Sequence, residues 1–231
     1  MKSMTKKLCL LAAVILMAAM LTSCGGPVPM KDADVGSYVT FGVYEQDNNL
    51  ANGKEPIEWR VLDKKEGYLL LISRYALDYK PYHEVKKGVT WGSCSLREWL
   101  NNDFLNAAFT SDEQALIPVA DVYAYSNPDY RYDANPGGST EDQVFLLSIQ
   151  EAEDYMFTKD RSCKATAYAQ AQGATIHENG NCWWWLRTPG NDQDNAAIVT
   201  PSGEISHHGD NVASKLDIVR PALWVKIHEQ P

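Results

Sequence analysis

A tryptophan-rich segment holds the side chains best suited to stacking on a ligand. Trp183, Trp184 and Trp185 are consecutive. Neighbouring side chains of a strand point to opposite faces, so at least one indole belongs to the core and another, which we take to be Trp184, faces a ligand. An exposed indole stacks well on a sugar or peptide ring. The alternative is that helices cover both faces of this strand.

The loop that follows carries several oxygen-bearing side chains. Asn191, Asp192, Asp194 and Asn195 lie close together, and their spacing suits either the hydroxyl groups of a ligand or a calcium ion. The loop lacks the glycine and the distal glutamate of an EF-hand. We therefore expect ligand binding without a cofactor here, and calcium binding is the alternative.

Arg187 and Arg220 stand in otherwise apolar strand segments. A buried guanidinium is unfavourable unless a carboxylate or several carbonyl groups pair with it. We expect such structural pairing, which would order nearby loops, at both positions. Arg187 lies just before the polar loop and is also a ligand-binding candidate.

The histidines do not predict a metal site. His207, His208 and Asp210 are close in sequence, but adjacent histidines in a strand point apart and the spacing matches no zinc signature. The chain contains no G-x-S-x-G, phosphate-loop or H-E-x-x-H motif. The sequence therefore predicts no metal ligand and no catalytic residue.

The first 24 residues have the layout of a secretory signal that ends in a cysteine. Three lysines precede an apolar run at 8–21 that is short for a membrane span. Leu-Thr-Ser-Cys at 21–24 resembles the lipobox, where diacylglycerol is attached to the cysteine and the chain is cut before it. We expect residues 1–23 to be a lipoprotein signal peptide and lipid on Cys24 to anchor the protein to the outer face of the cell membrane. An uncleaved anchor or an ordinary secreted protein is the alternative.

The composition of the remaining chain excludes some partners. Without residues 1–23 the chain has 18 basic and 30 acidic residues, a formal charge of −12, so it repels nucleic acid. Residues 24–36 mix glycine, proline and charge and read as a lipidated tether. Residues 37–228 are sufficient for a single domain with its own core.

Three cysteines remain besides Cys24 and the one in the signal peptide, so at most one disulfide forms within the chain. Export permits disulfides. We expect the pair to be Cys163 and Cys182, because Cys94 lies beside a predicted helix start, where a buried free thiol is common.

The periodicity of apolar residues predicts both strands and helices. Ser95 with Glu98 and Ser148 with Glu151 form capping-box patterns at two helix starts. The segment 119–140 has turn-forming residues and no periodicity, so we expect a long surface excursion. Strands are predicted at 37–46, 57–63, 68–73, 144–148, 182–188, 195–200, 204–206 and 217–227, and helices at 95–109, 111–117, 149–156 and 165–173. Strands, then helices, then strands indicate an α+β domain with mainly antiparallel sheets, whose last strand is expected beside the first.

Six ordered blocks of sequence extend across nearly the whole predicted domain: FGVYEQDN, PIEWRVL with LLLISRYALD, SLREWLNNDFLNAAF, FLLSIQEAE, WWWLRTPG and VRPALWV. Together they resemble the bacterial surface family called domain of unknown function 6273. The tryptophan-rich strand, the hairpin and the last strand with its arginine are also similar to the C-type lectin-like fold. That similarity implies two main helices on twisted antiparallel sheets with long loops and with the terminal strands paired. The Glu-Pro-Asn and Trp-Asn-Asp triplets of calcium-dependent sugar-binding lectins are missing, so such binding is not implied.

The function hypothesis that follows is a non-catalytic recognition module at the cell envelope. It would bind glycan or protein through the face built by the 119–140 excursion and the 188–195 loop, because long loops commonly carry binding sites. Two other classes stay open. An envelope enzyme would need a cluster of perturbed ionisable groups in a cleft, and a structural component of an envelope assembly would show a large exposed apolar patch.

Overall fold

The computed structural model describes residues 26–227. The predicted signal peptide and the predicted lipidation site at Cys24 lie outside the described residues. Within the described range, no helix has the length and the apolar character needed to cross a membrane.

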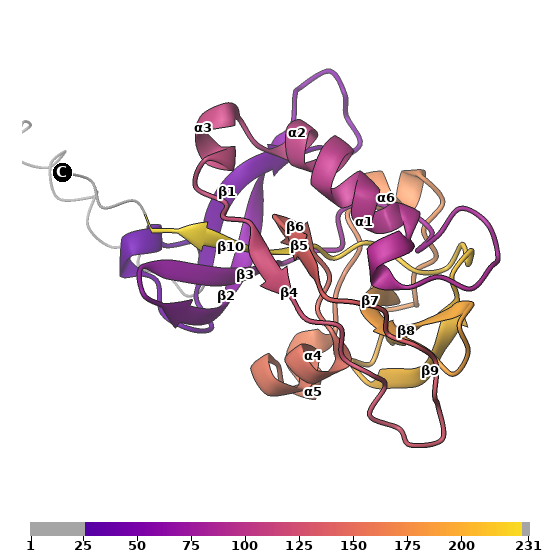
Figure 1. Cartoon of the computed structure of the whole chain (residues 1–231). Coiled ribbons are helices and arrows are strands. Elements are labelled where there is room, and N and C mark those ends of the chain that lie inside the picture. Colours follow the sequence, from indigo (N-terminus) through magenta and orange to yellow (C-terminus); the bar gives the residue numbers. More distant parts are fainter. Residues whose placement is uncertain (1–25, 228–231) are drawn as a thin grey trace, which may run out of the picture.

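The larger sheet has five strands, all antiparallel to their neighbours (Figure 1). The first three strands form the meander predicted at the start of the domain, in segments rich in β-branched and aromatic residues. The sheet order is β1-β2-β3-β10-β6. Its strands are β1 (Tyr38–Tyr44), β2 (Glu55–Lys65), β3 (Tyr68–Ser73), β6 (Val144–Phe145) and β10 (Ala222–Lys226).

The last strand, β10, lies between β3 and β6, so the expectation that it pairs with the first strand is wrong. The reason is the continuous apolar run of β3, in which Leu69 to Ser73 are all buried. Such a run is stable only in the middle of a sheet that is covered on both faces. Leu71 of β3 faces Leu223 of β10 in the ladder, and both side chains are fully buried.

The predicted helix at 95–109 is present as one continuous helical segment. It consists of α1 (Ser95–Trp99), a π-helical turn (Leu100–Phe104) and α2 (Leu105–Ala108). Leu96, Leu100 and Phe104 recur on its buried side, as the helical period predicts.

The cap of this helix differs from the prediction. Cys94 Sγ, not Ser95, accepts the hydrogen bond from Arg97 N at 3.4 Å. The Ser95 hydroxyl instead accepts from Glu84 N in the preceding loop. The box of Ser148 with Glu151 at the start of α4 (Ile149–Tyr155) is confirmed.

A second, three-stranded antiparallel sheet in the order β7-β8-β9 follows the helices, and a short ladder of β4 with β5 closes the base of the 119–140 excursion (Figure 1). The remaining strands are β4 (Ala120–Val122), β5 (Thr140–Asp142), β7 (Trp184–Pro189), β8 (Asn195–Val199) and β9 (Ile205–Asn211). The other short helices are α3 (Ser111–Gln114), α5 (Thr158–Arg161), α6 (Ala167–Ala171) and two 3-10 turns at Met30–Asp32 and Trp91–Ser93.

Both sheets and the helices share one hydrophobic core, which establishes a mixed α+β fold with antiparallel sheets. Part of the predicted tether belongs to this unit. Ala33 is fully buried, and Val28 N donates to Tyr38 O at 2.8 Å. The folded unit therefore begins nearer to residue 28 than to the predicted residue 37.

Candidate functional site

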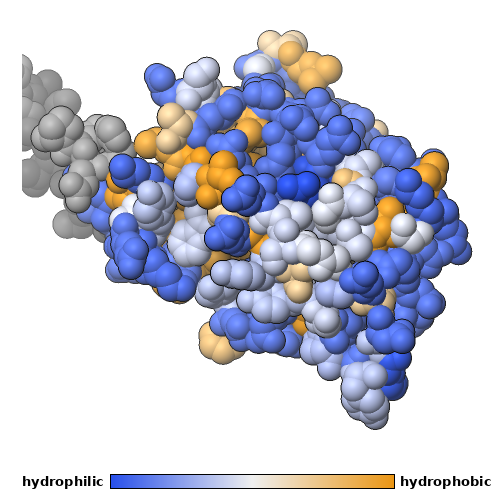
Figure 2. All heavy atoms as spheres, viewed as in Figure 1, coloured by the Kyte–Doolittle hydropathy of each residue, from blue (hydrophilic) through white to orange (hydrophobic). Residues whose placement is uncertain are grey.

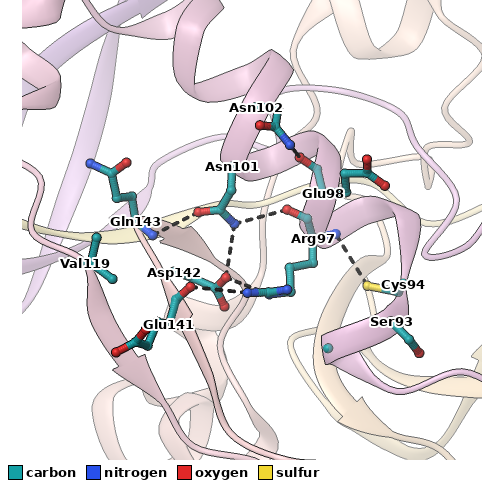
Figure 3. Close-up of a pocket in the computed structure, with 11 residues that line it drawn as sticks. Ser93, Cys94, Arg97, Glu98, Asn101, Asn102, Val119, Glu141, Asp142 and Gln143 are labelled. Carbon is teal, nitrogen blue, oxygen red and sulfur yellow. Dashed lines mark hydrogen bonds and ion pairs between the residues drawn. The ribbon is translucent and has the colours of Figure 1, made fainter.

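A polar groove of about 460 Å³ lies between the α1 helix and the β4–β5 ladder (Figure 3). One wall is formed by residues 92–94 and by the polar side of the helix, from Arg97 to Asn102. The other wall is formed by Val119 and residues 141–143. The groove thus lies at the base of the 119–140 excursion, the long surface segment that the sequence predicted.

A π-helical turn shapes the helical wall of the groove. Five residues, Leu100–Phe104, have this conformation, which is rare and is found often at functional sites. Within it, Asn101 donates to Val144 O at 2.8 Å and accepts from Gln143 N at 2.9 Å. Asn101 therefore fastens the helix to β6 and leaves Asn102 exposed on the groove side.

The centre of the groove is an ion pair between Arg97 and Asp142. Arg97 Nε donates to Asp142 Oδ1 at 2.6 Å, and Figure 3 shows Arg97 and Asn101 converging on this carboxylate. The buried Asp142 also accepts from Trp91 Nε1 at 2.9 Å and from Thr140 Oγ1 at 2.6 Å. These partners fix the pair in place, so it organises the wall of the groove.

Apart from the pair of Arg97 and Asp142, the charged side chains that line the groove are negative. Glu98 and Glu141 line it and are exposed, and neither takes part in an ion pair with another described residue. Cys94 is the sole thiol in its lining, and burial raises the pKa of that thiol to about 12. The Cys94 thiol is therefore protonated at neutral pH and does not act as a thiolate nucleophile.

The excursion and the 188–195 loop, which the sequence analysis assigned to one face, are joined in the structure. The buried Asn127 donates to Pro189 O at 3.0 Å and to His207 O at 2.7 Å. Gln193 donates to Val89 O and Asn135 O and accepts from Asn135 N at 2.9 Å. Two amide side chains thus hold both ends of the excursion against the second sheet.

Three tyrosines of the excursion are exposed. Tyr123 and Tyr125 are 58 % and 41 % exposed with ring centroids 6.3 Å apart, and Tyr130 near the tip is 95 % exposed. The sequence analysis assigned the excursion to the binding face but did not single out these residues. The signal that was available is the alternation Tyr-Ala-Tyr at 123–125.

Arg187 is a buried residue that holds the backbone of the segment carrying Tyr123 and Tyr125. It is 4 % exposed and forms a two-pronged ion pair with Glu151, in which Nη2 lies 2.7 Å from Oε1. It also donates to Leu146 O and, through Nε and Nη2, to Tyr123 O. Arg220 likewise donates to Ser73 O and Arg161 O. The prediction that both arginines are structurally paired is confirmed.

The prediction that Trp184 faces a ligand is wrong, because its side chain is buried. Trp184 and Trp185 are both fully buried, and only Trp183 is half-exposed. The Trp184 indole donates to Arg161 O at 3.0 Å, and the Arg220 guanidinium covers its ring at 4.9 Å. The strand is covered on both faces, by α5 at Trp184 and by the non-helical segment of Lys80 at Trp185, so the alternative of helices on both faces is only partly right.

Some polar side chains of the 191–195 loop already interact with other side chains of the protein. Asn195 donates to Asn191 Oδ1 at 2.6 Å, and Asp194 lies 3.5 Å from Lys86 Nζ. Asp192 is exposed. Three acidic side chains elsewhere in the described residues could hold a metal ion, because their ligand atoms lie within 4.8 Å of one another. They are Glu45, Asp47 and Glu55, which are not in this loop.

Cys163 and Cys182 are neighbours, and both are free buried thiols. Cys182 N donates to Cys163 O at 2.8 Å, and its Sγ lies 3.3 Å from the same oxygen. Burial opposes ionisation of Cys163, but the Cys182 thiol and the nearby Arg220 charge outweigh it and lower the pKa of Cys163. The structure therefore brings together the two cysteines that the sequence analysis paired.

Comparison with known proteins supports the resemblance seen in the sequence blocks. Searches of curated proteins and of solved structures returned no match. The family model described as Domain of unknown function (DUF6273) matches residues 66–227, which is more than half of the chain and runs from the β2–β3 turn to the end of β10. The chain belongs to the DUF6273 family.

Proposed function

We propose that this protein is a lipid-anchored, extracytoplasmic lipoprotein that recognises glycan without catalysing a reaction. The observation that carries the proposal is the excursion, whose exposed tyrosines are held in place by buried polar residues. Tyr123 and Tyr125 offer two adjacent ring faces, and tyrosine combines a stacking surface with a hydrogen-bonding hydroxyl. Polysaccharide chains present both apolar ring faces and hydroxyl groups, so they match this surface.

The fixed geometry of the excursion supports recognition. Asn127 anchors it to the second sheet, and Arg187 holds the backbone of Tyr123. A loop ordered before binding loses less conformational entropy when the ligand binds. The adjacent groove, with its asparagine side chains and its free carboxylates, would extend the contact to sugar hydroxyl groups.

The groove favours recognition over an enzyme of the cell envelope. Its arginine and its buried aspartate neutralise each other, and its cysteine thiol has a raised pKa. Figure 2 shows that the face of this view is largely hydrophilic, with hydrophobic residues in small separate groups. A purely structural role in an envelope assembly would call for a larger apolar patch.

The finer fold assignment, C-type lectin-like, belongs to the same proposal. The antiparallel sheets, the tryptophan-rich strand and the long loops support it. The position of β10 beside β3 differs from the pairing of terminal strands that this fold implies.

A glycan and peptide array probed with the full chain in detergent tests the recognition proposal. The double variant Tyr123→Ala/Tyr125→Ala should bind roughly tenfold more weakly, because each aromatic contact contributes about 0.5–1.5 kcal/mol. Phe157→Ala is the matched control, since Phe157 is 77 % exposed and is not part of the excursion. A chain that binds no glycan, or that binds only peptides, would refute glycan recognition.

The anchor is tested separately. Cys24→Ala should release the protein from membranes and abolish incorporation of labelled fatty acid, because the lipid would be attached to that thiol. Unchanged labelling would contradict the lipoprotein assignment and would leave the recognition experiment unaffected.

A further inference from the structure

Asp217 is a buried carboxylate without a partner. Its exposed fraction is 0 %, and neither carboxylate oxygen has a hydrogen-bond partner among residues 26–227. Two other buried acids, Asp78 and Asp142, each accept hydrogen bonds from aromatic side chains. An ionised carboxylate is very unfavourable in such surroundings unless something compensates its charge. Asp217 therefore either holds a proton or binds a cation that the chain itself does not supply.

The groups that act on Asp217 are an acid and a hydroxyl. Burial and then the negative charge of Asp210 raise the pKa of Asp217 to about 8, and the Ser214 hydroxyl acts in the opposite direction. None of the described groups that shift this pKa is cationic. Asp210 and Ser214 are half-buried, so the cluster borders solvent on their side.

The loop between β9 and β10 is folded so that these oxygens gather. Ser214 Oγ donates to Asp210 Oδ2 at 2.8 Å, and Ser214 N donates to Asn211 O at 2.7 Å. Leu216 N in turn donates to Ser214 Oγ at 3.2 Å. The chain therefore turns back on itself and places the side chains of Asp210 and Ser214 together, and both are close enough to Asp217 to shift its pKa.

We propose that this loop binds a calcium ion through the side-chain oxygens of Asp210, Ser214 and Asp217. The donors are all oxygens, which hard cations prefer, and the two carboxylates supply the opposite charge once the ion displaces the proton of Asp217. An irregular loop suits calcium, which accepts six to eight ligands in flexible geometry, better than magnesium, which requires a near-ideal octahedron. Loop carbonyl groups and water would complete the shell. The site is separate from the 191–195 loop, which the sequence suggested for calcium.

The ion would stabilise the support of the recognition face. Val212 N donates to Asp194 O at 2.9 Å, and His83 N donates to Val212 O at 2.7 Å. The β9–β10 loop is thus bonded directly to the loop that carries Gln193. The calcium site does not depend on the proposed function, because it rests on the buried carboxylate and on the loop that surrounds it.

Thermal unfolding of the full chain in detergent, with and without calcium, tests the proposal. Extracellular calcium modules bind with dissociation constants of about 0.1–1 mM, so about 10 mM calcium should raise the Tm by roughly 3–6 °C. Magnesium should have a smaller effect. Terbium, a luminescent calcium substitute, reports binding without unfolding the protein. Calcium should compete with it.

Two variants and two controls locate the ion. Asp217→Asn and Asp210→Asn should each lose the calcium-dependent shift and the terbium signal, and Asp210 is half-buried, so its variant is expected to fold. Asp112→Asn, at an exposed acid of α3, should keep both. Absence of any calcium shift in the unmodified chain would overturn the proposal. So would a shift that survives both site variants and is lost in Asp47→Asn, because it would place the ion at the cluster of Glu45, Asp47 and Glu55.

Discussion

Two regions of the molecule bury charge in opposite ways. At the end of β7, Arg187 has a two-pronged ion pair with Glu151 and hydrogen bonds to two backbone carbonyls. In the loop before β10, Asp217 has no partner within the described residues. Both side chains are almost completely inaccessible to solvent.

The difference separates structural charge from charge that awaits a ligand. A buried charge that the chain itself neutralises orders its surroundings, as Arg187 does for the backbone of Tyr123. A buried acid without such a partner stays protonated until a cation from outside binds to it.

Removal of Arg187 should have the largest effect. Arg187→Ala leaves Glu151 without its partner and frees Tyr123 O, so the free energy of unfolding should fall by about 3–5 kcal/mol. Urea unfolding measures this change. Arg131→Ala is the control, because that arginine pairs with Asp129 at the exposed surface, where such pairs contribute about 0–1 kcal/mol. Equal effects of the two variants would erase the distinction drawn for Arg187.

Oxidation of Cys163 and Cys182 to a disulfide should have the next largest effect. In the extracytoplasmic location proposed above, transfer of two electrons and two protons to a thiol oxidant would join these neighbouring thiols. Closure of a loop of about 20 residues stabilises a fold by roughly 3 kcal/mol. Thiol titration of the denatured mature protein, purified without reductant, should then detect Cys94 alone. A count that includes all three would show that the pair stays reduced.

Loss of the Asn127 amide should have a smaller effect on stability and a clear local one. Asn127→Ala leaves the carbonyl groups of Pro189 and His207 without their donor, at about 1–3 kcal/mol. Hydrogen exchange should become faster in residues 123–135, because the excursion is released. Asn106→Ala, which removes an exposed side chain of α2, should leave that exchange unchanged. Protection that persists without Asn127 would mean that Gln193 alone holds the excursion.

Titration of His83 should give the smallest effect. Burial and then the positive charge of Lys87 lower the pKa of His83 below its usual 6.5. The unfolded chain therefore binds a proton at higher pH than the folded chain, and stability falls as the pH falls from 6.5 towards the lowered pKa. His83→Gln keeps an acceptor for Ser95 N and removes the titration. Its Tm should decline less than that of the unmodified chain between about pH 7 and pH 5, and parallel curves would contradict this role.

Local patterns predicted the elements well because their signals lie within a few residues. The meander from Tyr38 to Ser73 follows alternation, and the box of Ser148 with Glu151 follows from hydrogen bonds three residues apart. The helix cap at Cys94 was missed because Cys94 and Ser95 can both accept a hydrogen bond from the first helical turn. The Ser95 hydroxyl is occupied by Glu84 N of the preceding loop, which leaves Cys94 as the cap. The place of β10 depends on strands far away in the sequence.

The candidate site was predicted only in part. The contact between the excursion and the 188–195 loop followed from the placement of long loops, and the pairing of Arg187 followed from the unfavourable burial of charge. Trp184 was misplaced because alternation says which side chains share a face but not what covers that face. The groove and Asp217 could not be predicted, because each arises where segments distant in sequence meet.

For the exported lipoprotein proposed above, the insertion of β10 between β3 and β6 determines when the larger sheet can close during secretion. The strand that completes the centre of the larger sheet, Ala222–Lys226, is made about 150 residues after its partner β3. A polypeptide that is threaded across a membrane from its amino end cannot close this sheet until those residues have crossed. The nascent chain should therefore remain open, and sensitive to proteases, through most of its passage, and any truncation before residue 222 should yield no stable product.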